Sequence, residues 1–244
     1  MIRREEFEFE QEIMTGSHIA VPFQVTLTAD GTLDLLVYSF AEKTAEEFEK
    51  AYSTDPFTDE AKAYLAEKLA PVMEEFGFDT DAALECVHLE YRCDAPNTGK
   101  ILPDCVLIDS LDGEEWEDLP LDEFDLDPEN PLDRMAVIRD DGKIVCFAGL
   151  NDISEEDGLL EVTVECEEAY RRKGYGASCI AKITEYLLGL GEDVKYVCSD
   201  DNLPSARTAE SAGYSLQSTC MPFVCYKFEE DEEFDEESDE EDPE

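Results

Sequence analysis

Residues 167–179, EEAYRRKGYGASC, place three consecutive cations in front of two closely spaced glycines, in a chain that carries 64 acidic residues. The stretch follows an alternating, strand-like segment from Leu160 to Cys166 and precedes a helical pattern from Ala177 to Leu190. The first N–H groups of a helix are unpaired, and glycines let a ligand approach the backbone. This order of elements therefore predicts an anion-binding site.

The anion is predicted to be a cofactor phosphate. Cations at a helix N-terminus oppose the helix dipole, and a phosphate lying between them would compensate for that. A Walker loop is absent, because no G-x-x-x-x-G-K-[ST] run occurs in the sequence. A dinucleotide fingerprint would begin at Gly174 and Gly176, but its third glycine position holds Cys179. Both of these nucleotide-binding patterns are therefore disfavoured.

The turn and a second landmark downstream resemble the GCN5-related N-acetyltransferase (GNAT) family over roughly residues 100 to 228. The R-x-x-G-x-G signature of that family is met by Arg171, Gly174 and Gly176. The second landmark is DDNLPSARTAESAGY, which holds an asparagine, a hydroxyl residue three positions on and a Gly-aromatic pair; these are Asn202, Ser205, Gly213 and Tyr214. The order and spacing of the two landmarks carry the resemblance.

The resemblance implies an acetyl-CoA site and no metal. The strand backbone at Val164, Glu165 and Cys166 would hydrogen-bond the pantetheine arm and the thioester carbonyl. The pyrophosphate would lie on the turn formed by Arg171, Arg172, Lys173, Gly174, Tyr175, Gly176 and Ala177. Asn202, with Ser205, would contact the coenzyme further along. The chemistry of the family is direct attack of a neutral amine on the thioester, so no protein nucleophile is required.

A protonated amine must lose its proton before it attacks, which calls for a carboxylate or a water chain leading to one. Glu161 and Glu165 are the candidate bases, because their strand leads into the predicted cofactor site; an ordinary role as solvent-facing residues stays open. Many family members place a tyrosine seven residues after the asparagine, where this chain has Ala209. Tyr214, Tyr175 or water would then replace this general acid, or the protein is slow or inactive.

Composition restricts the partners. A formal net charge of -46 argues against binding nucleic acid or an anionic membrane through a basic surface, and favours a cationic amine substrate. Polyamines, aminoglycosides, lysine side chains and protein N-termini remain equal alternatives. Nine irregularly spaced cysteines without C-x-x-C, and only His18 and His88, resemble neither a disulfide framework nor a zinc site. The charged N-terminus and the lack of a long apolar run predict a cytoplasmic protein.

The expected fold is α/β, with a mixed, mostly antiparallel central sheet flanked by helices, similar to the acyl-CoA N-acyltransferase fold, and an N-terminal α+β extension. Residues 1–95 form that extension, residues 96–228 the GNAT-like domain and residues 229–244 an acidic disordered tail. The extension is expected to contain a hairpin around 23–40 and a helix near 61–76, which Pro71 should kink or divide. It would supply an acceptor pocket or a dimer surface, so a homodimer is left open.

Two further classes of function stay open. A non-catalytic acyl-CoA-binding sensor or scaffold, with an acidic interaction surface, would explain the alanine at position 209. An acidic interaction protein or nucleic-acid mimic would bind no coenzyme at all. The leading hypothesis remains an N-acetyltransferase that transfers the acetyl group of acetyl-CoA to a primary amine of a cationic small molecule or protein.

Overall fold

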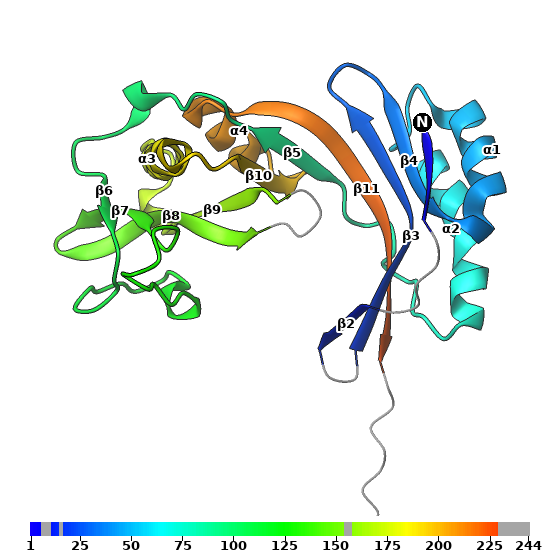
Figure 1. Ribbon diagram of the computed structural model, residues 1–244, viewed down its shortest axis with the longest axis horizontal. Coiled ribbons are helices and arrows are strands. Elements are labelled where there is room, and N and C mark those ends of the chain that lie inside the picture. The colour runs from blue at the N-terminus through cyan, green and yellow to red at the C-terminus, as the bar shows by residue number, and fades with distance from the viewer. Residues whose placement is uncertain (6–10, 15–16, 154–157, 229–244) are drawn as a thin grey trace, which may run out of the picture. The chain divides into compact units, whose positions relative to one another are not determined.

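A computed structural model describes residues 1–5, 11–14, 17–153 and 158–228 (Figure 1). The chain divides into two compact units that interleave along the sequence. The first unit contains Met1–Val25, Asp34–Glu85 and the segment that begins at Pro222, and the second contains Thr26–Leu33 and Cys86–Met221. The boundary expected near residue 95 stays a prediction, and the predicted acidic tail at 229–244 lies outside the described residues.

The first unit packs helices with a group of β-strands. The strands are β1 (Ile2–Glu5), β2 (Gln11–Met14), β3 (Ser17–Thr28), β4 (Leu33–Tyr38) and the end of β11 (Ser215–Phe228), and the helices are η1 (Ser39–Ala41), α1 (Glu42–Tyr52) and α2 (Asp59–Glu75). β1 pairs with β4 in parallel, and β2 pairs with β3 in antiparallel orientation. Apolar side chains from these elements, including Phe23, Phe48 and Met73, are fully buried.

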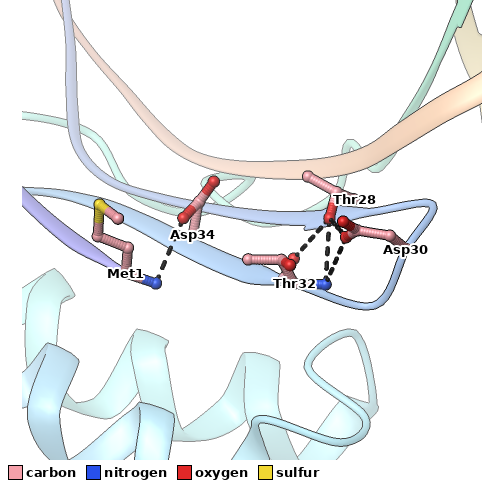
Figure 2. Close-up of polar contacts among 5 residues, drawn as sticks. All are labelled: Met1, Thr28, Asp30, Thr32 and Asp34. Atoms are coloured by element: carbon pink, nitrogen blue, oxygen red, sulfur yellow. Dashed lines mark hydrogen bonds and ion pairs between the residues drawn. The ribbon is translucent and has the colours of Figure 1, made fainter.

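The predicted hairpin and the predicted helix are both present in the structure. β3 and β4 are neighbours, and their connecting turn is held by hydrogen bonds among Thr28, Asp30 and Thr32 (Figure 2). Thr58 caps α2, because its side chain accepts a hydrogen bond from the Ala61 N–H over 3.2 Å. Pro71 does not divide α2, which continues past this residue as one helix, and the kink stays a prediction.

The second unit is built on a mixed, mostly antiparallel sheet, as predicted. The strand order is β6 (Val106–Ile108), β7 (Met135–Asp140), β8 (Lys143–Ile153), β9 (Leu160–Cys166), β10 (Val194–Ser199), β5 (His88–Arg92) and the beginning of β11. The β9–β10 pairing is parallel, and the other pairings of β5 to β10 are antiparallel. The helices of this unit are η2 (Thr98–Lys100), η3 (Leu121–Glu123), η4 (Glu168–Tyr170), α3 (Tyr175–Leu190) and α4 (Leu203–Ala212).

The two faces of this sheet carry separate cores. Leu160 and Val162 of β9 pack with α3 and α4 residues such as Ile180 and Ala209. Met135 and Phe147 pack on the other face, against the segment that connects β6 to β7, including Leu121. In Figure 1 this green segment lies on the side of the strands away from α3. Alternation along each strand therefore decides which core a residue joins.

One boundary differs from the expectation. α3 begins at Tyr175 instead of Ala177, because Gly174 adopts a left-handed conformation and starts the helix at the next residue. β11 is a single strand from Ser215 to Phe228, and Pro222 lies within it. Among the described residues, no helix combines the length and apolar character that a membrane span requires.

Candidate functional site

The strands β9 and β10 separate after a short parallel contact. β10 pairs with β9 only at Val194–Leu160 and Lys195–Glu161. Beyond this point β10 continues along β5, and β9 continues along β8 as far as Cys166. In the described part of the chain, no strand pairs with the β10-facing edge of β9 beyond Glu161. Backbone N–H and C=O groups demand partners, so this edge can receive an extended ligand, and it includes the predicted residues Val164, Glu165 and Cys166.

The N-terminus of α3 follows β9 by way of the predicted glycine turn. Gly174 has a φ of +84° and Arg172 a φ of +63°, both in the left-handed region. No side chain caps this helix end. The Ser178 N–H bonds to the Gly174 carbonyl over 3.0 Å, which leaves the amides of Tyr175, Gly176 and Ala177 as the first-turn donors. Such a helix end suits an anion.

Gly176 fits tight packing behind this turn. A Cβ at this position would lie 3.2 Å from Cγ2 of Thr208 on α4 and 3.5 Å from Cγ2 of Val164 on β9. The glycine thus allows the start of α3 to lie close to both elements. This close approach brings the first-turn amides next to the separated stretch of β9.

The three cations of the turn have different surroundings. Arg171 donates from Nε to the Cys166 carbonyl over 3.0 Å, which ties the turn to the end of β9. Lys173 Nζ lies 4.3 Å from the ring centroid of Tyr170, whose ring stacks with that of Tyr175. Arg172 is exposed. All three cations therefore stay at the surface of the turn, where they can reach a solvent-borne anion.

Asn202 and Ser205 already have partners in the structure. Asn202 Oδ1 accepts a hydrogen bond from the Ser205 N–H over 3.2 Å and so caps α4. The Ser205 hydroxyl lies 2.7 Å from the hydroxyl of Tyr196. Burial is the main cause that raises the pKa of Tyr196. A local structural role thus accounts for the Asn-x-x-Ser spacing, and the coenzyme contact predicted for these two residues stays a prediction.

The two candidate bases lie on the sheet face away from α3. Glu165 stands directly opposite Phe147, a member of the core on that face, and Thr163 stands opposite Gly149. Glu165 is exposed, whereas Glu161 is half-buried and accepts a hydrogen bond on Oε1 from the Asn151 side-chain amide over 3.2 Å. Asn151 was missed in the sequence because only the strand pairing brings it to Glu161.

Tyr214 lies in the core on the α3 side of the sheet. It is only 4% exposed, and its hydroxyl lies 2.7 Å from Oγ1 of Thr184. Burial raises its pKa above that of an ordinary phenol. Its ring packs edge-on against Tyr196. This position does not support the role of general acid that the sequence suggested for Tyr214, whereas Tyr175 lies at the glycine turn itself.

Two further features bear on the chemistry. Ala209 is completely buried, so the position at which the family resemblance led us to expect a tyrosine is part of the core. Cys146 stands opposite Cys166 on the paired strands, and Cys105 Sγ lies 3.8 Å from Cys179 Sγ; all four are free thiols. In the parts of the chain that the structure describes, His, Cys, Asp and Glu side chains form no group of three suited to a metal ion.

Comparison with a model of a known family supports the resemblance. The model of the acetyltransferase (GNAT) family matches residues 100–214. A GNAT-family structure from Novosphingobium aromaticivorans is 19% identical, with a TM-score of 0.44, and the match covers 59% of this chain and 65% of that one. A GCN5-related N-acetyltransferase-like protein from Streptococcus suis is 20% identical, with a TM-score of 0.41 and coverage of 65% and 67%.

A third structure, a GCN5-related N-acetyltransferase from Sphaerobacter thermophilus, is 11% identical with a TM-score of 0.45, and the match covers 87% of this chain and 76% of that one. No curated protein matches the sequence at a significant level. The chain thus spans about two thirds of the length of the first two structures.

Proposed function

We propose that this chain, whose residues 100–214 form a domain of the acetyltransferase (GNAT) family, transfers an acetyl group from acetyl-CoA to a primary amine of a cationic molecule. Family membership supports acetyl transfer in general. The choice of acetyl-CoA as donor and of an amine as acceptor goes further, and it is supported by the donors and carboxylates around β9. The net charge of -46 would draw a cationic acceptor toward the protein.

One observation carries the proposal: the uncapped N-terminus of α3 adjoins the edge of β9 that β10 leaves unpaired. The residues present fit the coenzyme, because amide donors with adjacent cations suit a pyrophosphate and an open strand edge suits the amide-bearing pantetheine arm. The amides of residues 175–177, with Arg171, Arg172 and Lys173, would hold the pyrophosphate. The backbone of residues 164–166 would hold the arm, and Asn202 and Ser205 would add contacts further along.

The bound coenzyme supplies an activated acyl group as its thioester. The task left to the chain is to hold the acceptor and to take its proton. We assign the role of general base, which accepts the proton of the amine, to Glu161 in preference to Glu165. The hydrogen bond from Asn151 fixes the orientation of the Glu161 carboxylate. With direct attack by the amine, the chain needs no nucleophile of its own. The departing thiolate would be protonated by water or by Tyr175.

A second candidate function is a non-catalytic acyl-CoA-binding sensor. The observation that favours it is the complete burial of Ala209, which leaves no side-chain acid at this position. Both functions require coenzyme binding, so turnover must distinguish them. Release of free CoA in the presence of a panel of amines supports the enzyme, whereas tight binding without release supports the sensor.

The test of coenzyme binding is a calorimetric titration with acetyl-CoA. The double variant Arg172→Glu, Gly174→Val should lose binding, because it reverses a charge at the turn and strains the left-handed start of α3. Lys43→Glu is the matched control, since it reverses an exposed charge on α1. Wild-type affinity in the double variant, with an unchanged far-UV spectrum, would refute the assignment of the turn.

A further inference from the structure

A pocket of about 230 Å³ lies within the second unit, on the sheet face away from α3. Three segments line it: residues 123–126 from the connection between β6 and β7, residues 132–135 from the end of that connection and the first residue of β7, and residues 149–151 of β8. Phe124 and Leu126 of this connection also pack against the core on that face. The pocket is therefore formed between the sheet and the segment that covers it.

The pocket adjoins the candidate base. Gly149 on its floor stands directly opposite Thr163 of β9, and Thr163 shares its sheet face with Glu161 and Glu165. Asn151 lines the pocket and donates its hydrogen bond to Glu161. A molecule in the pocket would thus lie on the side of β9 that carries the carboxylates.

The floor of the pocket depends on the absence of a side chain at Gly149. A Cβ there would lie 3.6 Å from Cε of Met135 and 3.8 Å from the Arg134 carbonyl, which are ordinary contact distances. Gly149 has no positive φ, so its backbone conformation does not require glycine. Glycine leaves open a volume that a larger side chain would fill.

Arg134 fixes the wall of the pocket. Its guanidinium donates to the carbonyl oxygens of Pro128, Asn130 and Asp133 over 2.8–2.9 Å. These bonds direct its charge into the loop. The remaining lining combines apolar side chains, such as Phe124 and Leu132, with the carboxylates of Glu123, Asp125 and Asp133. The pocket therefore suits a ligand with an apolar body, which would contact the apolar side chains, and a cationic group, which would contact the carboxylates.

We propose that this pocket binds the acceptor and selects a compact primary monoamine with an apolar body, such as an arylalkylamine. The proposal rests on the proposed function and narrows its substrate class. The volume is below the roughly 300 Å³ at which pockets for drug-sized ligands begin, which disfavours an aminoglycoside. The apolar side chains of the lining would leave the hydroxyl groups of a polar ligand without partners, at a cost in free energy.

The experiment is a calorimetric titration of 2-phenylethylamine into the full chain, wild type against Gly149→Leu and Gly149→Ala. Leucine should fill the pocket and weaken binding by at least about tenfold, or about 1.4 kcal/mol. Alanine should change the affinity by less than about threefold, because its Cβ meets only ordinary contacts. Asp125→Asn, at the exposed rim, provides a variant that leaves the floor intact and should weaken amine binding most at low salt.

Spermidine and kanamycin are the competing ligands in the same titration. Tighter binding of either one, no binding of 2-phenylethylamine, or wild-type affinity in a folded Gly149→Leu variant would each overturn the proposal. Acetyl-CoA affinity measured on the same variants separates this result from a failure of the proposed function. Coenzyme binding that persists while phenylethylamine binding is absent refutes only the acceptor pocket, whereas loss of coenzyme binding in the wild type refutes the enzyme itself.

Discussion

The side-chain amide of Asn151 donates a hydrogen bond to Oε1 of Glu161 over 3.2 Å and so connects β8 to the candidate base on β9. We expect Glu161→Gln to lower kcat by about 10²–10⁴-fold, the usual effect of losing a general base. Acetyl-CoA affinity should stay at the wild-type value, because the carboxylate lies on the sheet face away from α3. Steady-state kinetics and calorimetry together check both parts.

Glu165→Gln is the matched control on the same strand, and it should retain most of the activity. Asn151→Ala should produce an intermediate loss, because Glu161 remains but its orientation is no longer fixed. A larger loss in Glu165→Gln than in Glu161→Gln would transfer the role of base to Glu165.

Because Tyr214 and Thr184 form a buried pair, we expect a substitution of Tyr214 to lower stability and to leave kcat nearly unchanged. Tyr214→Phe leaves the Thr184 hydroxyl without its partner at 2.7 Å, which should reduce the free energy of unfolding by about 1–3 kcal/mol. The kcat value should change little, because Tyr214 lies in the core. Tyr175→Phe, at the glycine turn, is the comparison. A large fall in kcat in a stable Tyr214→Phe variant would restore Tyr214 as general acid.

We expect substitution of Gly213, at the end of α4, to lower the free energy of unfolding strongly. A Cβ there would lie 2.7 Å from the Asn97 nitrogen and 2.9 Å from the Ala95 carbonyl oxygen, and its φ is +107°. Gly142 also has a positive φ but has open space around it. Both alanine variants should lose the roughly 1–2 kcal/mol of a left-handed residue, and Gly213→Ala should lose about 1–3 kcal/mol more through overpacking. Equal losses in urea denaturation would contradict this.

In the turn between β3 and β4, we expect the pKa of Asp30 to depend on the hydroxyl group of Thr28. The Thr28 hydroxyl, followed by Thr32, lowers the pKa of the exposed Asp30 carboxyl (Figure 2). Thr28→Val should therefore raise the pKa of Asp30 toward its usual range, as measured by NMR titration. A depressed folded-state pKa stabilises the fold above the unfolded pKa, and this contribution is lost as pH falls through the folded value. The difference in the free energy of unfolding between the wild type and Thr28→Val should thus diminish on acidification.

The elements that could be predicted are those whose signals are local. The alternation of Leu160 to Cys166 and the glycines at 174 and 176 lie next to each other in the sequence, and β9, the turn and α3 follow in that order. Asn151 could not be predicted, because its contact with Glu161 depends on the register between β8 and β9. The direction of the Tyr214 side chain could not be predicted either, because a Gly-aromatic pair in the sequence does not show which way the aromatic ring points.

β11 contributes its last residues to the first unit from the far end of the chain. Cys225 Sγ donates to the Ala20 carbonyl, and the Val224 N–H donates to the Ala83 carbonyl over 2.8 Å. During synthesis on the ribosome, this unit must therefore wait for residues 222–228 before these contacts form. Its early segments will therefore expose apolar surface for longer than those of a contiguous domain, and a fragment ending near residue 95 would lack that strand.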